Sequence, residues 1–317
     1  MRMDAYYAMQ WPRENLFCTG YIHEVMNFRY NWHETEYELN ILLHGRAEYC
    51  RDGESWLLEE DDMILIDPGV GHASFALESD TYALVLRVSA SAFRALLPPG
   101  QGYSFQHFVT DASNRYRPEF NLLRYCAARF LESASQPGPV SRLGARAALE
   151  LLITGLAQHT QPRQLRTATE GDSLHQETIR RITQYVEENY ASKITLEELS
   201  KFSQYNRTYI STFFKNTVGM NFYEYLTRVR FQHALYELTS TNKNLTEIAI
   251  DNGFPDLKSF NTRFYATFRR RPAEYRPLLA PDCAKVGLGQ MYYRQIEEPA
   301  IRTKLAEYTA LGLDRRS

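Results

Sequence analysis

The stretch DNGFPDLKSFNTRF, residues 251–264, decides the fold of the C-terminal half of this chain. It joins a glycine-phenylalanine turn, Gly253-Phe254, to a segment whose apolar and polar residues separate at helical spacing. The inward set is Leu257, Phe260 and Phe264, and the outward set is Lys258, Asn261 and Thr262. Glycine at the turn permits a positive backbone φ. The stretch therefore predicts a helix with one buried and one polar face, presented by a tight turn.

The same arrangement occurs fifty positions earlier, in the stretch that begins at Ile194. With this offset Ile210 falls on Phe260 and Phe214 falls on Phe264, on the inward side. The outward residues of the earlier helix are Thr208, Ser211, Thr212 and Lys215. A short helix, a turn and a second amphipathic helix form a helix-turn-helix module. Between the modules, residues 222–241 predict one long helix, which would hold two recognition helices about 34 Å apart, the spacing of successive major grooves.

These motifs resemble the AraC/XylS family of bacterial transcription regulators. The first module contributes LEELSKF, NRTYISTFFKNTVGMNFYEYL and RVRFQHAL, and the second contributes IAIDNGF, SFNTRF and RRPAEYR. The resemblance covers residues 175–276 and implies a double helix-turn-helix domain that binds double-stranded promoter DNA, with RNA polymerase as a further partner. The sequence departs from the family at Tyr265, where a basic residue is usual, and at Arg269, where a glycine is usual.

The second helix of each module supplies most of the candidate DNA contacts. Asn can pair with adenine, Lys can reach guanine or phosphate, and Thr offers a hydroxyl and a methyl group. The basic run 269–271 would add phosphate contacts that strengthen affinity without reading sequence. The candidate DNA-binding residues are Arg207, Thr208, Ser211, Thr212, Lys215, Lys258, Ser259, Asn261, Thr262 and Arg270. Asn206 and Asp256 are instead candidate helix N-caps. A single polar helix face is also typical of a helix that is merely solvated. The occurrence of the same face in two modules favours DNA binding.

The N-terminal half is strand-like from about Tyr21 to Val88, with short β-branched or aromatic runs broken by turns such as RDGES. This pattern predicts a small antiparallel barrel or sandwich. NWHETEYELNILLHG and DDMILIDPGVGH resemble the two motifs of cupins, which implies a sensor barrel. The candidate effector-binding residues are Asn31, His33, Glu38, Tyr49, Trp56 and His72. Three interpretations stay open: a ligand site, a metal site of two histidines and one carboxylate, and ordinary structural histidines.

The predicted fold class is α+β multidomain, a β-rich cupin-like barrel with a helical hairpin followed by an all-α tandem helix-turn-helix domain. The predicted divisions are 1–117 for the effector-sensing domain, 118–160 for a hairpin suited to dimerisation, 161–173 for a polar linker, 174–276 for the DNA-binding domain and 277–317 for a tail of unassigned role. The hairpin carries more apolar surface than a small barrel needs, which indicates either a dimer contact or simple packing on the barrel.

Composition narrows the class of protein further. The net charge of −2 over 317 residues makes any nucleic-acid surface local. Four dispersed cysteines, the lack of an apolar run of membrane length and the lack of a signal-like N-terminus favour a cytoplasmic protein that does not contact the membrane. We expect no cofactor, no metal and no catalytic residues, and a homodimer that activates transcription in response to a small effector. Among effectors of the family, carbohydrate is the commonest case. The alternatives are a metal-dependent cupin enzyme and a helix-turn-helix protein that acts through protein contacts.

Overall fold

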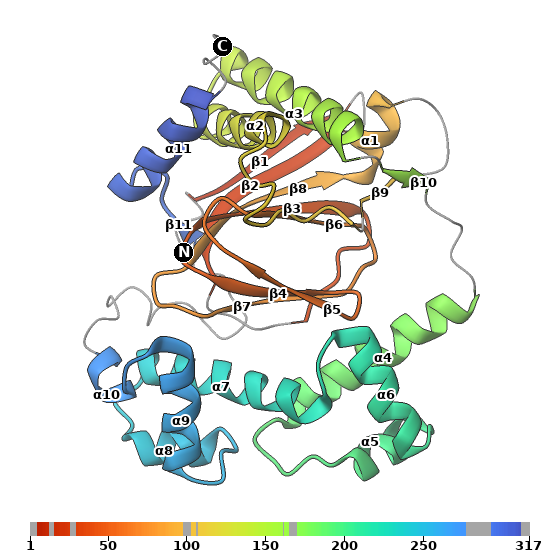
Figure 1. Ribbon diagram of the computed structural model, residues 1–317, viewed down its shortest axis with the longest axis vertical. Coiled ribbons are helices and arrows are strands. Elements are labelled where there is room, and N and C mark those ends of the chain that lie inside the picture. The colour runs from red at the N-terminus through yellow and green to blue at the C-terminus, as the bar shows by residue number, and fades with distance from the viewer. Residues whose placement is uncertain are drawn as a thin grey trace.

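A computed structural model of the protein describes residues 5–12, 16–25, 30–97, 103–105, 107–160, 162–164, 170–276 and 293–311. Strands fill the N-terminal part and helices fill the C-terminal part (Figure 1). This arrangement confirms the predicted fold class.

The barrel consists of two antiparallel sheets that lie face to face (Figure 1). The larger sheet has the order β1 (Tyr6–Trp11), β2 (Leu16–Glu24), β8 (Tyr82–Ser89), β3 (Glu36–His44) and β6 (Met63–Ile66). The smaller sheet has the order β5 (Glu54–Leu58), β4 (Ala47–Arg51) and β7 (His72–Ala76). Because successive side chains in a strand point to opposite faces, each sheet has an inner face toward the other sheet and an outer face.

The outer face of the larger sheet is apolar and is covered by two adjacent helices. Leu39 of β3 and Leu84 of β8 belong to one buried cluster with Phe130 of α2 (Pro118–Ala134) and Leu152 of α3 (Pro139–His159). These two helices form the helical hairpin that the sequence predicted. A short helix, α1 (Ala90–Leu96), follows β8, and the strands β9 (Tyr103–Ser104) and β10 (Arg163–Gln164) pair with each other.

The helices of residues 170–276 lie beyond the smaller sheet, on the side opposite to α2 and α3 (Figure 1). They are α4 (Glu170–Asn189), α5 (Leu196–Ser203), α6 (Arg207–Val218), α7 (Phe222–Ser240), α8 (Leu245–Asp251), α9 (Leu257–Phe268) and α10 (Pro272–Tyr275). The helix α4 begins inside residues 161–173, the segment that the sequence predicted as a linker. At 1.5 Å per residue, α7 is about 28 Å long and connects the two helix-turn-helix modules.

Local signals fix the boundaries of the two recognition helices, α6 and α9. The side chain of Asn206 accepts a hydrogen bond from the backbone N–H of Tyr209, and Asp256 accepts one from Ser259. Both residues are therefore the N-caps that the sequence predicted. Gly253 has a φ of 76°, and an added Cβ would approach the carbonyl oxygen of Ala191 to 2.8 Å. Only glycine meets both conditions without strain, so this turn depends on it.

The C-terminal segment returns to the sensor side of the molecule. The strand β11 (Tyr293–Arg294) pairs with β2, and α11 (Pro299–Leu311) packs on α2 (Figure 1). The sequence left this tail without an assigned role, and the apolar residues of α11 form only a narrow stripe. Ile301, Leu305 and Tyr308 make up that stripe, and all three are buried.

No helix within the described ranges is long and apolar enough to span a membrane. Cys18, Cys50 and Cys126 are buried free thiols, whereas Cys283 lies outside the described residues.

Candidate nucleic-acid interface and barrel site

The inward faces of the two recognition helices are fully buried, as predicted. Ile210 and Phe214 of α6 and Phe260 and Phe264 of α9 each have no exposed surface. The ring of Phe260 packs against Phe254, Phe231 and Phe264, with centroid distances of 5.4, 6.2 and 5.8 Å. Packing of these aromatic rings fixes which face of α9 points outward.

The opposite faces carry the predicted DNA-binding residues. Eight of the ten are exposed: Arg207, Thr208, Ser211, Thr212, Lys215, Lys258, Thr262 and Arg270. Ser259 and Asn261 are half-buried, and the side-chain oxygen of Asn261 is buried without a hydrogen-bond partner. The guanidinium of Arg207 forms an ion pair with Glu197 at 2.9 Å, so part of its charge is already neutralised. The structure thus gathers nine of the candidate residues on two helices, with Arg270 just beyond the end of α9.

The C-terminal ends of α6 and α9 differ in a way that affects stability. Each helix ends on a left-handed residue, Gly219 with φ 86° in α6 and Arg269 with φ 55° in α9. The two positions are fifty residues apart, which is the offset between the modules. An L-residue with a side chain pays about 1–2 kcal/mol in this conformation, whereas glycine pays almost none. Arg269 is therefore a strained cap.

We expect Arg269→Gly to raise the free energy of unfolding of the helix-turn-helix region by about 1 kcal/mol, because it removes this strain. Urea denaturation followed by far-UV circular dichroism measures the change. The control is Arg270→Gly, since Arg270 is exposed and does not have a positive φ. A loss of stability in Arg269→Gly equal to that of the control would contradict the interpretation.

A polar cluster centred on Glu38 lies on the inner face of the larger sheet. Its carboxylate accepts hydrogen bonds from Arg87 Nε at 2.9 Å and from Asn40 Nδ2 at 3.0 Å. His33 Nε2 lies 2.8 Å from the same carboxylate, and His72 Nε2 lies 3.4 Å from it. Glu38 is 6% exposed, so one buried carboxylate is held by four side chains. We call these five residues the Glu38 cluster.

Electrostatics keep the Glu38 carboxylate charged. Burial alone would raise its pKa, but the charge of His72, hydrogen bonds from His33 and His72, and the charge of Arg87 together hold this pKa well below its usual range. Burial raises the pKa of the Tyr49 hydroxyl, and the charge of Glu38 adds to that effect. The cluster therefore combines a fixed anion with several hydrogen-bond donors.

The structure brings most of the predicted effector-binding residues to the barrel interior. Asn31 and His72 exchange backbone hydrogen bonds of 2.8 and 3.0 Å, so they share one face. Tyr49 and Trp56 are directly opposite each other on β4 and β5, and the Tyr49 hydroxyl is 3.5 Å from Asn40 Oδ1. Trp56 contacts a different side chain. The Arg51 guanidinium lies over its ring, 4.6 Å from the ring centroid.

Sequence reasoning missed Asn40 and Arg87 of the Glu38 cluster, as well as Tyr21 and Thr19 beside it. Arg87 contacts Glu38 directly, and its guanidinium lies over the ring of Tyr21 at 5.5 Å. Thr19 stands opposite Arg87 in the register of β2 and β8, is fully buried, and its hydroxyl has no hydrogen-bond partner. The only signal was period-2 alternation in β2 and β8, which gives the face of each residue but not its neighbour on another strand.

A metal ion fits this cluster poorly. The ligand atoms of His33, Glu38 and His72 lie within 4.8 Å of one another, which is compatible with a cation. However, the Arg87 guanidinium already binds the same carboxylate oxygen that faces His33, Oε2. A divalent ion there would lie against a fixed positive charge, and the residue in the usual third histidine place is Asn31. The donor set therefore favours hydrogen bonding to a polar ligand.

The outer face of the smaller sheet contacts the helix-turn-helix region. The ring of Phe75 on β7 lies between the guanidinium groups of Arg228 and Arg263, at 5.0 and 5.4 Å. Arg228 on α7 also pairs with Glu48 of β4 at 2.7 Å. Glu48 and Phe75 are the sequence neighbours of residues that point into the barrel. One layer of strands therefore separates the barrel interior from the connecting helix α7.

Comparisons with known proteins agree with this division of the chain. A family model described as a helix-turn-helix domain matches residues 199–277, and one described as a cupin domain matches residues 27–89. An uncharacterized HTH-type transcriptional regulator from Staphylococcus aureus (strain COL) is 27% identical over 169 residues, which cover 53% of this chain and 22% of that relative. The uncharacterized HTH-type transcriptional regulator YijO from Escherichia coli K12 is 30% identical over 129 residues, 40% of this chain and 44% of the relative. The chain thus spans less than half the length of these curated relatives.

Solved structures show similarity at lower levels. ToxT from Vibrio cholerae has a TM-score of 0.38 and 14% identity, covering 84% of this chain and 99% of that chain. The C-terminal domain of AraT, a response regulator from Geobacillus stearothermophilus, has a TM-score of 0.31 and 29% identity over 32% of this chain and 85% of that chain. The chain thus combines a cupin domain with an AraC-type helix-turn-helix domain, as its resemblance to the AraC/XylS family implied.

Proposed function

We propose that this protein is a transcription regulator that binds promoter DNA through α6 and α9 and senses a small effector through the barrel. The observation that supports DNA binding most directly is the pair of exposed polar faces on two helices joined by the rigid helix α7. Phosphate neutralisation would supply affinity and base contacts would supply site choice. RNA polymerase is the natural further partner of a regulator bound at a promoter.

Selection of genomic fragments by the purified protein tests this function. We expect a small set of fragments to bind with submicromolar affinity, and the affinity to fall steeply as salt rises, because counterions are released from phosphates. Failure of every genomic fragment to bind at moderate salt would instead favour a protein that acts through protein contacts. The genes beside the selected fragments would indicate the chemistry of the effector.

Replacing Asn261 with alanine should relax preference at one base position by about 1–3 kcal/mol. Folding stability should stay the same or rise, because the substitution removes a carbonyl oxygen that is buried without a partner. Competition binding with single-base variants of a selected fragment measures the first effect, and thermal unfolding measures the second. Equal weakening on specific and random DNA would show that Asn261 does not read a base.

For the effector we propose a small polyhydroxylated molecule, a carbohydrate. The Glu38 carboxylate, the Arg87 guanidinium and the unpartnered Thr19 hydroxyl would bind hydroxyl groups. Tyr21 and Tyr49 would cover the apolar face of a sugar ring. A thermal-shift screen of monosaccharides tests this, with a rise in melting temperature expected for at least one sugar. Metal analysis tests the enzyme alternative, which requires stoichiometric metal lost on His33→Ala.

We also propose that a second copy of the chain covers the exposed stripe of α3. Val140 is 81% exposed, Leu143 is 67% exposed and Leu151 is 41% exposed, and all three lie on one side of the helix. An apolar stripe of this kind on a surface helix marks a contact site, and a regulator with paired half-sites uses two copies.

The substitution Leu143→Glu should convert a dimer to a monomer, because it places charge inside the apolar contact. Sedimentation velocity measures the state, and Thr303→Glu, at an exposed position of α11, is the control. A wild-type chain that sediments as a monomer at all concentrations would overturn this interpretation.

A further inference from the structure

The segment 293–311, which we call the C-terminal strap, lies beyond the DNA-binding helices in sequence but packs on the sensor barrel in space. Its strand β11 pairs with β2 through Tyr293 opposite His23 and Arg294 opposite Ile22. Its helix α11 packs along α2 (Figure 1). Residues 170–276 therefore stand between β10, which pairs with β9, and the strap, so the DNA-binding region is tied to the sensor domain on both sides.

Tyr293 links the strap to the Glu38 cluster through the ring of Tyr21. Its ring lies edge-on to the rings of Tyr21 and Tyr6, with centroid distances of 5.2 and 5.8 Å. Tyr21 in turn lies under the guanidinium of Arg87, which binds Glu38. Since Tyr293 pairs with His23, it is on the inner side of the larger sheet, as Tyr21 is. The strap thus adds an aromatic ring to the wall of the proposed effector site.

Arg294 anchors the strap beside this ring. Its guanidinium pairs with Asp80 at 2.8 Å, with Glu24 at 3.2 Å and with Glu298 at 2.6 Å, and it lies over the ring of Tyr82 at 4.7 Å. Two of these carboxylates belong to the barrel and one belongs to the strap. A network with several partners around one arginine fixes geometry better than an isolated surface pair does.

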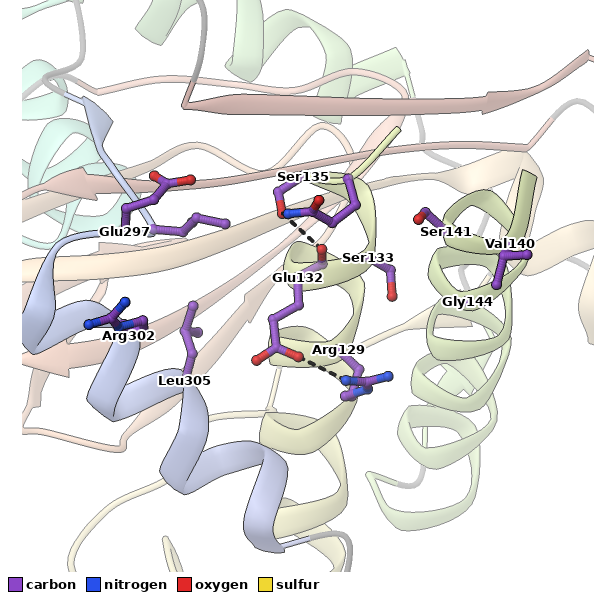
Figure 2. Close-up of a pocket in the computed structure, with 12 residues that line it drawn as sticks. Arg129, Glu132, Ser133, Ser135, Val140, Ser141, Gly144, Glu297, Arg302 and Leu305 are labelled. Atoms are coloured by element: carbon purple, nitrogen blue, oxygen red, sulfur yellow. Dashed lines mark hydrogen bonds and ion pairs between the residues drawn. The ribbon is translucent and has the colours of Figure 1, made fainter. Parts of the chain in front are cut away.

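The second anchor is on α11. Lys304 pairs with Glu60 at 2.6 Å and with Asp61 at 2.9 Å, and the Tyr308 hydroxyl donates to Asp61 at 2.6 Å. Between α11, α2 and α3 a cavity of about 590 Å³ remains, with Arg302 and Leu305 on one side and Glu132 and Ser141 on the other (Figure 2). The strap is held at its two anchors, and the open cavity leaves part of α11 without close packing.

We propose that Tyr293 contacts the effector and that the C-terminal strap transmits occupancy of the barrel to the DNA-binding region. This inference rests on the effector-sensing role proposed above. A ligand stacked on Tyr293 would hold the strap on the barrel, and an empty site would hold it less tightly. Because the strap and β10 together limit how residues 170–276 sit on the barrel, strap release shifts the population of arrangements that can engage DNA.

The test uses full-length protein with four substitutions. Tyr293→Ala removes the ring, Tyr293→Phe keeps it, Arg294→Ala breaks an anchor, and Thr303→Ala is a control at an exposed position of α11. Hydrogen exchange is measured on ligand-free protein. The exchange rates of the backbone amides in α11 and at Ile22 and His23 of β2 report release of the strap. Fluorescence anisotropy with a selected genomic fragment reports DNA binding, and titration of the monosaccharide with the largest thermal shift reports the barrel site.

We expect Arg294→Ala to speed exchange in α11 and to change the dissociation constant for DNA by about fivefold or more, whereas Thr303→Ala changes neither. Tyr293→Ala should weaken sugar binding by about five- to tenfold, with Tyr293→Phe close to wild type, since ring stacking carries the effect. Faster exchange with unchanged DNA affinity overturns the coupling, and unchanged sugar affinity in Tyr293→Ala overturns the contact. If no monosaccharide binds the wild-type protein, the carbohydrate proposal and the Tyr293 contact both fail. The exchange and DNA measurements still decide the coupling.

Discussion

Phe260→Ala is expected to lower the free energy of unfolding of the helix-turn-helix region by about 3–5 kcal/mol, the cost of removing a buried aromatic side chain. Phe260 has no exposed surface and lies at the centre of an aromatic group formed by Phe231, Phe254 and Phe264. Alanine would leave a cavity that neighbouring rings cannot fill, because each ring is held by other contacts. Sequence-specific DNA binding should be lost with the fold of α9.

The composition of the chain provides two separate probes for this measurement. Trp11 and Trp56 pack within the barrel half, whereas Trp32 contacts Arg180 of α4, so in a Trp32→Phe background tryptophan fluorescence reports unfolding of the sensor domain. Far-UV circular dichroism reports the helices, most of which belong to residues 170–276. Phe260→Ala should shift the dichroism transition to lower urea and leave the fluorescence transition nearly unchanged. Tyr265→Ala, at a 53% exposed position on the same helix, is the control. A shift in Phe260→Ala no larger than in this control would contradict the buried role.

The helix-turn-helix region could be predicted from sequence because its signals are local or repeated. The burial of Ile210 and Phe260 follows from helical spacing in two modules, and the caps Asn206 and Asp256 come directly before the helices that they cap. The strain at Arg269 was visible as a departure from glycine, although its left-handed conformation required the structure. The buried stripes and the caps follow from neighbours within four residues.

The barrel site was predictable only in part, since it depends on strand register. Alternation along β3 places Glu38 on the inner face, but its partner Arg87 is 49 residues away. No local rule states which residue of β8 stands opposite Glu38. The position of the C-terminal strap was even harder to predict from the sequence. Ile301, Leu305 and Tyr308 have helical spacing, but nothing in the sequence says that this helix packs on α2 and not on the DNA-binding helices.

Glu38→Gln is the prediction with the largest effect on the sensor domain. It should lower the free energy of unfolding by about 3–5 kcal/mol, because loss of the carboxylate charge leaves the largely buried Arg87 guanidinium without its ion-pair partner. The tryptophan fluorescence transition should move while the helical transition of residues 170–276 is largely retained. Binding of any sugar found in the thermal-shift screen should be lost as well. Glu54→Gln, at an exposed position on β5, is the matched control.

The pH dependence of the same variant separates a charge effect from a packing effect. The folded-state pKa of Glu38 is well below 4.5, whereas that of an unfolded glutamate is about 4.3. A depressed pKa stabilises the fold fully above the unfolded value, and this stabilisation is lost as pH falls toward the folded value. The difference in unfolding free energy between wild type and Glu38→Gln should therefore be constant near neutral pH and narrow below about pH 4.5. A difference that stays the same at low pH would mean that the substitution acts through packing, and the carboxylate would then not be the charged centre of the cluster.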